Sequence, residues 1–285
     1  MVAPSSPFDP AAFEAGVEKL RTRYQVKFDE EIRDRRGYLA GEDTRRLAEL
    51  RGAMEDPDVT AIVAARGGYG ATRLLETLTV AEVATRPKLL VGFSDVTALH
   101  AAWGRAGLRS LHGPMVAALG RDREDGLDRF VAAAEGDPPP PLRATAALVG
   151  GTAEGPLLGG NLAVLASLLG TPWEPRVHGA VLLLEDVGER PYRIDRMLTS
   201  LRLAGWFERV VAVVLGGFTD CEPGPDGTTV EQVLAERLGD LPVPVLTGLP
   251  SGHAGHNVPL PLGAPAKVDG GTGTLTILEA ATEAG

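Results

Sequence analysis

The residue with the clearest potential for chemistry is Ser94, which lies at an abrupt corner in the sequence. Residues 89–93 read Leu-Leu-Val-Gly-Phe and predict a buried strand, whereas residues 95–99 predict the start of a helix. A serine at such a corner is exposed at the carboxyl edge of a sheet, where open α/β sheets bind ligands. The amides that follow it stabilise negative charge, as in the nucleophile elbow of hydrolases. Because the second glycine of G-x-S-x-G is absent, Ser94 could instead be a plain helix N-cap, with Asp95 supporting the helix dipole.

A glycine-rich segment lies between another predicted strand and the next helix. It reads Arg66-Gly67-Gly68-Tyr69-Gly70, and its adjacent glycines let backbone amides approach a ligand closely and adopt positive φ. Such a loop suits half of an oxyanion hole or a phosphate cradle, and a plain tight turn is the structural alternative. The spacing matches neither the G-x-G-x-x-G dinucleotide fingerprint nor a P-loop, so a nucleotide site is disfavoured.

One acid and two histidines of the second half are candidates for acid–base chemistry. Glu185 ends an apolar run at residues 181–184, and a carboxylate there is commonly functional or paired because burying it alone is costly. His253 and His256 share a late glycine-rich loop, and histidine is the usual general base near neutral pH. A metal site built from both histidines and an acid such as Asp186 is the alternative, although the spacing is a weak signal for it.

The other histidines and the single cysteine have no catalytic motif around them. His100 lies one turn beyond the Ser94 corner and is expected to be a packing residue, while His112 and His178 have no supporting pattern. Cys221 is expected to be a structural thiol, since a catalytic cysteine needs a base and electropositive surroundings. A single cysteine also excludes an intrachain disulfide and a zinc site built from several cysteines.

Charge and composition exclude several classes of protein. The 285 residues include 28 Lys and Arg against 38 Asp and Glu, a net charge of −10, and lack the basic footprint of nucleic-acid binders. Hydrophobic residues make up 44% of the chain, which is typical of globular proteins rather than of disordered ones. No stretch approaches the roughly 20 apolar residues that span a membrane, and the first residues lack the features of a signal peptide. We therefore expect a cytoplasmic location, with neither a nucleic-acid nor a membrane partner.

These residues must be positioned by an α/β framework. Short, continuous apolar runs predict strands covered on both faces, at residues 59–64, 88–93, 180–184, 210–215 and 244–247. Helical spacing of apolar residues predicts helices at residues 10–24, with Asp9 as N-cap, and 43–54. Alternation of strands and helices predicts a doubly wound α/β layer. Four prolines at residues 138–141 favour a stiff spacer, and a mixed α+β second domain fits the turn-rich second half. The expected division is residues 1–137 as the α/β domain, 138–155 as linker and 156–285 as the second domain.

Taken together, the motifs resemble those of the serine LD-carboxypeptidase family, which includes muramoyltetrapeptide carboxypeptidases and microcin immunity peptidases. The resemblance covers nearly the whole chain, and many motifs in the right order make it highly specific. The matching segments are residues 3–7, 66–70, 92–97, 159–162, 170–173, 184–186, 193–198, 252–253 and 260–263. The chain differs mainly at its start, where it begins almost on the Ala-Pro-Ser motif, so the first strand is expected to be short or partly missing.

The resemblance implies a catalytic triad in the order serine, glutamate, histidine. Ser94 would be the nucleophile, Glu185 the acid and His253, rather than His256, the base. The amide of Asp95 would hold the oxyanion, together with that of either glycine in the glycine-rich loop, Gly67 or Gly68. The candidates for contacting substrate are Arg66, Tyr69 and Asn161.

The resemblance also implies a fold, a substrate and an assembly. The fold would be α/β, with a flavodoxin-like doubly wound N-terminal domain and a smaller β-rich C-terminal domain, and the site would lie between them. The substrate would be a murein tetrapeptide, cleaved between an L-centre diamino acid and a terminal D-amino acid during peptidoglycan recycling. Catalysis would need no metal and no cofactor, and the protein would be a homodimer.

Several points stay open at the level of sequence. The terminal carboxylate of the substrate calls for an arginine, and the choice lies among Arg66, Arg193 and Arg196; the last is expected instead to pair with Asp195 or Asp186. One rival function is an immunity-type hydrolase of a peptidyl-nucleotide antibiotic. The other is a non-catalytic module that binds peptides.

Overall fold

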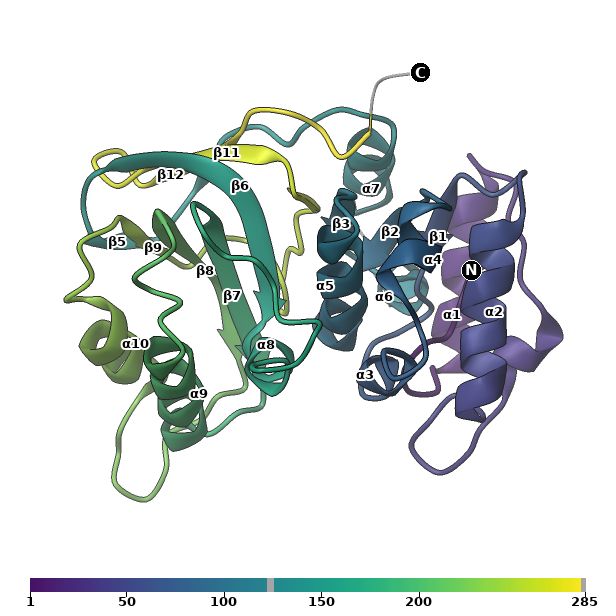
Figure 1. Ribbon diagram of the computed structural model, residues 1–285, viewed down its shortest axis with the longest axis horizontal. Coiled ribbons are helices and arrows are strands. Elements are labelled where there is room, and N and C mark those ends of the chain that lie inside the picture. Colours follow the sequence, from purple (N-terminus) through teal and green to yellow (C-terminus); the bar gives the residue numbers. More distant parts are fainter. Residues whose placement is uncertain (122–125, 283–285) are drawn as a thin grey trace.

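The computed structural model describes residues 1–121 and 126–282, which form two halves side by side, each built around its own sheet (Figure 1). The sheet of the first half has the strand order β1-β2-β3-β10. Its parallel strands are short and buried: β1 (Ala61–Val63), β2 (Leu89–Gly92) and β3 (Ser110–His112). The fourth strand, β10 (Leu260–Leu262), comes from the far end of the chain and pairs antiparallel with β3.

Helices cover both faces of the first sheet, which makes it doubly wound. Leu89 and Val91 of β2 pack on one face with α1 (Pro10–Arg21), α6 (Val116–Arg121) and α7 (Gly126–Ala134). Leu90 points to the other face, against α2 (Asp43–Glu55), α3 (Ala71–Leu74), α4 (Val80–Ala84) and α5 (Thr97–Arg105). Alternate side chains of one strand thus enter two separate cores, as the continuous apolar run predicts.

The second half is rich in β-structure, with the strand order β4-β12-β11-β6-β7-β8-β9-β5. The strands are β4 (Leu142–Arg143), β5 (Ala146–Val149), β6 (Thr152–Asn161), β7 (Val181–Val187), β8 (Ala212–Thr219), β9 (Val245–Thr247), β11 (Pro265–Asp269) and β12 (Thr274–Ile277). Strands β6 to β9 are parallel to one another. On one face lie α8 (Leu162–Ser167), α9 (Pro191–Leu203) and α10 (Val230–Leu238), and the opposite core is shared with β10, β11 and β12.

Most of the predicted elements are present, and the fold class is confirmed. Each predicted strand overlaps an observed one, both predicted helices form, and Asp9 caps α1 by accepting a hydrogen bond from Ala11 N. Val2 makes a single parallel bridge with Ala64 rather than a full strand, in agreement with the expectation of a short first strand. The prediction for residues 138–155 differs from the structure, since this segment contains β4, β5 and the beginning of β6 rather than a free linker.

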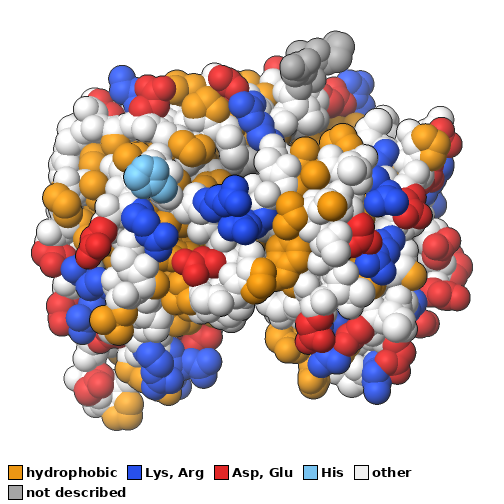
Figure 2. All heavy atoms as spheres, in the orientation of Figure 1, with side chains coloured by type: hydrophobic (Ala, Val, Ile, Leu, Met, Phe, Trp, Pro, Cys, Tyr) orange, Lys and Arg blue, Asp and Glu red, His pale blue; other side chains and the backbone are white. Residues whose placement is uncertain are grey.

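Charged side chains of both signs are spread over the visible surface (Figure 2). On the face seen in Figure 2, positive and negative side chains are interspersed, and a small group of positive side chains lies over the seam between the halves. Among the described residues, no helix is both long and apolar enough to cross a membrane.

Candidate active site

Ser94 occupies a strained corner between the first sheet and helix α5. It directly follows β2 and Phe93 and begins a short 3₁₀ turn, Ser94–Val96, which leads into α5. Its φ is 62°, a left-handed conformation that is unfavourable for a residue with a Cβ. Strain of this kind persists only where the surroundings enforce it, and it is common at functional sites. The predicted strand–corner–helix is therefore confirmed.

The glycine-rich loop lies directly against Ser94. A Cβ on Gly67 would come within 2.9 Å of Ser94 Cβ, 3.1 Å of its Oγ and 3.4 Å of the Asp95 amide nitrogen. Gly68 has a φ of 110°, and a Cβ there would meet Ser6 Oγ at 2.4 Å. Within residues 1–121 and 126–282, neither glycine amide donates a hydrogen bond to a protein acceptor. Both N–H groups are therefore free of protein acceptors among the described residues, as an oxyanion hole requires, and Gly67 is the glycine that lies against Ser94.

Two buried charged side chains hold the glycine-rich loop in place. Asp95 is 3% exposed, and its Oδ2 accepts a hydrogen bond of 2.8 Å from Ala71 N at the start of α3. Burial raises the pKa of Asp95, against the lowering effects of Ser5 and the Ala71 amide. Arg46 of α2 is fully buried and donates to the carbonyl oxygens of Gly70 (2.9 Å) and Pro4. Arg46 was not predicted to have a role, because an arginine on a helix gives no local sign that it will be buried.

Glu185 and His253 form a tight pair in the second half. Glu185 is fully buried in β7, at a point where the register with β8 shifts between Leu184 and Asp186. Irregularities of this kind commonly re-aim a side chain beside an active site. Glu185 Oε2 accepts hydrogen bonds from His253 Nδ1 (2.6 Å) and from the His253 backbone amide (3.1 Å).

This pair fixes the protonation of the His253 ring. Because a carboxylate only accepts, Nδ1 must carry the proton, which leaves the Nε2 lone pair free to act as a base. Gly252 makes the approach possible: its φ is 80°, and a Cβ there would lie 2.5 Å from Glu185 Oε2. The ring is partly exposed, whereas the acid behind it is not.

The two halves meet where the histidine ring contacts the residue before Ser94. The rings of Phe93 and His253 have centroids 4.8 Å apart and planes inclined at 57°. Among the described residues, no hydrogen bond joins Ser94 Oγ to His253, so the serine and the pair are adjacent without a direct link. Catalytic hydrogen bonds are often long or absent without substrate and tighten when it binds.

His112 lies on the other side of Glu185. It is fully buried at the end of β3, and its Nε2 is 3.9 Å from Glu185 Oε1. Burial alone raises the pKa of Glu185, but His112 and His253 more than offset that effect and hold the pKa at about 2. No role for His112 was predicted from the sequence. The available signal was its position at the carboxyl end of a buried strand, next to the strand that leads to Ser94.

The neighbouring acid and amide have structural partners. Asp186 is 2% exposed and accepts hydrogen bonds from Asn161 Nδ2, Ala163 N and Val187 N. Burial is the main cause that raises its pKa to about 6. Asn161 also caps α8 through its side-chain oxygen, which accepts from Val164 N. Both side chains therefore stabilise the junction of β6, β7 and α8 beside Glu185.

The candidate substrate-binding residues lie in varied settings. Arg66 donates to the carbonyl oxygen of Pro7, and Tyr69 is 47% exposed beside Tyr38. Arg193 pairs with Glu189. The expected pairing of Arg196 with an acid is wrong, because its guanidinium stacks on the ring of Tyr192. The two acids that it was expected to contact have other partners. Asp195 pairs with Arg237, and Asp186 accepts a hydrogen bond from Asn161.

The residues considered for metal or thiol chemistry have other settings. Within the described part of the chain, no group of three or more His, Cys, Asp or Glu side chains is arranged to hold a metal ion. His256 is exposed. Cys221 is buried, donates to the Thr219 carbonyl oxygen, and has its pKa raised mainly by burial, as expected of a structural thiol.

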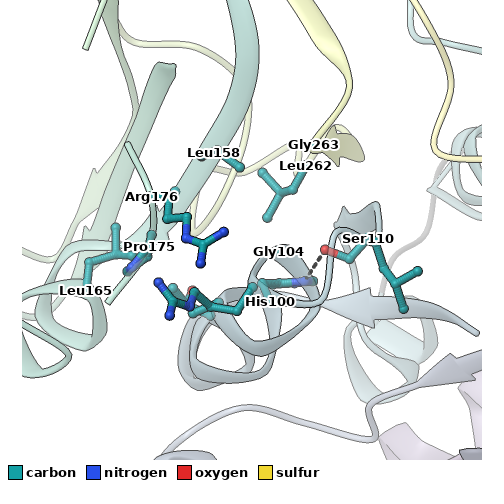
Figure 3. Close-up of a pocket in the computed structure, with 14 residues that line it drawn as sticks. His100, Gly104, Ser110, Leu158, Leu165, Pro175, Arg176, Leu262 and Gly263 are labelled. Carbon is teal, nitrogen blue, oxygen red and sulfur yellow. Dashed lines mark hydrogen bonds between the residues drawn. The ribbon is translucent and has the colours of Figure 1, made fainter. Parts of the chain in front are cut away.

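A small cavity of about 70 Å³ lies in the same seam, between residues of α5 and β3 on one side and of β6 and α8 on the other (Figure 3). His100 lines it and makes two hydrogen bonds, Nδ1 with Ser110 Oγ (2.8 Å) and Nε2 with the Gly92 carbonyl oxygen (2.9 Å). Since the carbonyl only accepts, Nε2 carries the proton of a neutral ring. Burial lowers the pKa of His100 to about 3, so its predicted packing role is confirmed. Ser94, Glu185 and His253 do not line this cavity.

Comparison with known proteins defines the class. Residues 1–113 match the family model of the LD-carboxypeptidase N-terminal domain, and residues 154–268 match that of the LD-carboxypeptidase C-terminal domain. The chain therefore belongs to the LD-carboxypeptidase family.

Individual relatives span nearly the whole chain. It is 41% identical to a putative carboxypeptidase of Synechocystis sp., over 98% of this chain and 93% of the relative. It is 33% identical to the murein tetrapeptide carboxypeptidase of Pseudomonas aeruginosa, over 95% of this chain and 92% of the relative. The crystal structure of muramoyltetrapeptide carboxypeptidase from Oxalobacter formigenes superposes with a TM-score of 0.84 at 32% identity, covering 96% of each chain. A more distant relative, 26% identical over 85% of this chain and 80% of its own, is the microcin C7 self-immunity protein of Escherichia coli.

Proposed function

We propose that this protein is a metal-independent serine LD-carboxypeptidase with the triad Ser94, His253 and Glu185. The observation that carries the proposal is the pairing of a buried carboxylate with a histidine whose free nitrogen is a base, beside a serine held at a left-handed corner. Family membership and relatives named as murein carboxypeptidases support the same reaction.

In the first step, His253 Nε2 takes the proton from Ser94 Oγ as the oxygen attacks the scissile carbonyl carbon. Glu185 keeps Nδ1 protonated and stabilises the imidazolium that forms. The amide of Asp95, with that of Gly67 or Gly68, would hold the negative oxygen of the tetrahedral intermediate. Preorganised amides of this kind each contribute about 3–4 kcal/mol to catalysis.

In the second step, the C–N bond breaks and the imidazolium gives its proton to the leaving amine. The amine leaves as a free terminal D-amino acid, such as D-alanine. Water then attacks the acyl-enzyme with His253 again as base, which releases the shortened peptide and restores Ser94. The bond cleaved would join an L-centre diamino acid to the D-residue of a murein tetrapeptide, as expected of peptidoglycan recycling.

The proposal also covers the contacts to the substrate, the oligomeric state of the protein and its location in the cell. Exposed Tyr69 and nearby Arg66 are the residues we expect to contact the peptide, while Asn161 would act through its neighbours because its side chain is already bonded. A homodimer and a cytoplasmic location stay predictions.

The test compares matched substrates and one variant. Wild-type protein should release D-alanine from a tetrapeptide ending in D-alanine but release no L-alanine from the L-terminal isomer, and EDTA should leave the rate unchanged. Ser94→Ala should lower kcat by at least about 10³-fold. Retained activity in Ser94→Ala would exclude covalent catalysis by this serine, and a loss in EDTA restored by zinc would contradict metal independence.

The microcin immunity relative supports one competing activity, hydrolysis of a peptidyl-nucleotide antibiotic. An aminoacyl sulfamoyl adenylate assayed in parallel distinguishes the two. A kcat/KM higher for the adenylate than for the tetrapeptide would assign the chain to the immunity activity, with the same triad.

A further inference from the structure

His112 and Glu185 present unpaired polar atoms to each other in the seam between the halves. Within the described residues, both ring nitrogens of His112 and Oε1 of Glu185 are buried without a hydrogen-bond partner. The facing atoms, His112 Nε2 and Glu185 Oε1, are 3.9 Å apart, and both side chains are fully buried. Unpaired buried atoms are rare in folded proteins and call for an explanation.

Glu185 Oε1 faces the imidazole of His112. Its other oxygen already accepts two hydrogen bonds from His253. Gly160 of β6, with a φ of 137°, brings the backbone close to His112, since a Cβ there would lie 3.4 Å from its Cδ2. The two groups also belong to different sheets, because His112 ends β3 and Glu185 lies in β7.

A buried histidine with a purely structural role looks different in this protein. His100, whose ring centroid is 6.2 Å from that of His112, has both nitrogens satisfied by Ser110 and the Gly92 carbonyl. His112 has neither nitrogen satisfied, yet it is aimed at the one free oxygen of the acid.

We propose that His112 is a positioning residue, whose Nε2–H donates to Glu185 Oε1 when the two halves close by about 1 Å around a substrate. That approach shortens the distance between His112 Nε2 and Glu185 Oε1 from 3.9 Å to the ordinary length of a hydrogen bond. The carboxylate is then held at both oxygens, by His253 from its own half and by His112 from the other. The inference rests on the proposed function, because it gives His112 a task in orienting the proposed base.

The lowered pKa of Glu185 agrees with this arrangement. A buried carboxylate without donors has a raised pKa, whereas here the histidines on both sides hold the pKa at about 2. His112 therefore helps to keep the acid ionised, which the stabilisation of an imidazolium requires.

The test compares two substitutions at residue 112. His112→Gln keeps an N–H near the position of Nε2, whereas His112→Met has a similar volume and no donor. We expect His112→Met to lower kcat by about 10- to 100-fold, with KM changed less than twofold. His112→Gln should recover most of the loss. Rates are counted per active site titrated with a serine-directed fluorophosphonate, below the unfolding temperature of each variant, so that poor folding does not imitate lost catalysis.

A double-mutant cycle decides whether the effect passes through Glu185. In the Glu185→Gln background, His112→Met should change the single-turnover rate less than twofold. An equal loss in both backgrounds, or equal losses in His112→Gln and His112→Met, would overturn the proposal and leave His112 a packing residue.

A spectroscopic readout separates this inference from the proposed function. The downfield proton resonance of His253 Nδ1–H reports its hydrogen bond to Glu185 and needs no turnover. It should shift or broaden in His112→Met and remain close to wild type in His112→Gln. If Ser94 is neither labelled nor needed for activity, the proposed function fails; an unchanged resonance in His112→Met contradicts the positioning role alone.

Discussion

The two halves position their parts of the site by different means. The first half holds Ser94 through its backbone, with φ at 62° and the glycine-rich loop pressed against it. The second half holds His253 through side-chain chemistry, with a buried carboxylate bonded to its ring and to its amide. Steric constraint therefore sets the place of the nucleophile, and hydrogen bonding sets the state of the base. The two halves should respond to different kinds of substitution.

The largest effect is expected where the base loses its carboxylate. Glu185→Gln should lower kcat by about 10⁴-fold, because the amide can present its N–H to Nδ1 and favour the wrong tautomer. Steady-state assays of D-alanine release measure the change. Asp186→Asn is the matched control: it is also buried, one residue away and bonded elsewhere, and it should change kcat less than tenfold. Comparable losses in the two variants would mean that Glu185 acts only through packing.

Adding a methyl group tests the backbone on each side. Gly67→Ala places a Cβ 2.9 Å from Ser94 Cβ, and Gly252→Ala places one 2.5 Å from Glu185 Oε2. Each should lower kcat by about 10²-fold, since a displacement of about 1 Å at a catalytic group has that cost. The controls are Gly52→Ala and Gly255→Ala, where nothing lies within 4 Å of the added Cβ. If the rate falls equally in the controls, close packing is not the reason for these glycines.

Stability against pH tests the electrostatics of the second half. Because the folded-state pKa of Asp186 is raised from 3.8 to about 6, the folded protein binds this proton more tightly than the unfolded chain. The contribution of Asp186 to the free energy of unfolding is complete below pH 3.8, its pKa in the unfolded chain, and is lost as the pH rises through about 6. Between pH 4.5 and 7, wild type should lose about 2 kcal/mol of unfolding free energy that Asp186→Asn does not lose. Urea titrations at both pH values measure this difference, and parallel curves would contradict it.

The smallest effect concerns the strain at the corner. Ser94→Gly should be more stable than Ser94→Ala by about 1 kcal/mol, since glycine adopts positive φ without penalty. The opposite order is expected at Ser200 within α9, where glycine weakens a helix. Thermal unfolding of the four variants gives both differences. The same order at both positions would mean that the corner is not strained.

Local signals explain what the sequence predicted well. The corner at Ser94 can be predicted from consecutive residues, and Glu185 can be predicted from its place at the end of an apolar run. Elements built on distant partners were missed, such as β10, whose three residues make a strand only because β3 lies beside them. His112 and Arg46 were missed for the same reason, because their partners lie on other elements and burial depends on the assembled fold. The segment at residues 138–155 was taken for a linker because prolines mark an interruption, although its later residues pair with distant strands.

Strand β10 also bears on how the molecule assembles. Its pairing joins Leu260 to His112 across about half of the chain, and loop closure of that length slows folding. Until β10, in the last tenth of the chain, pairs with β3, that strand has an open edge able to pair with any other strand, which favours aggregation. We therefore expect residues 1–113, although matched by a domain model of their own, to associate with themselves when expressed alone. Supplying the remainder of the chain should rescue them.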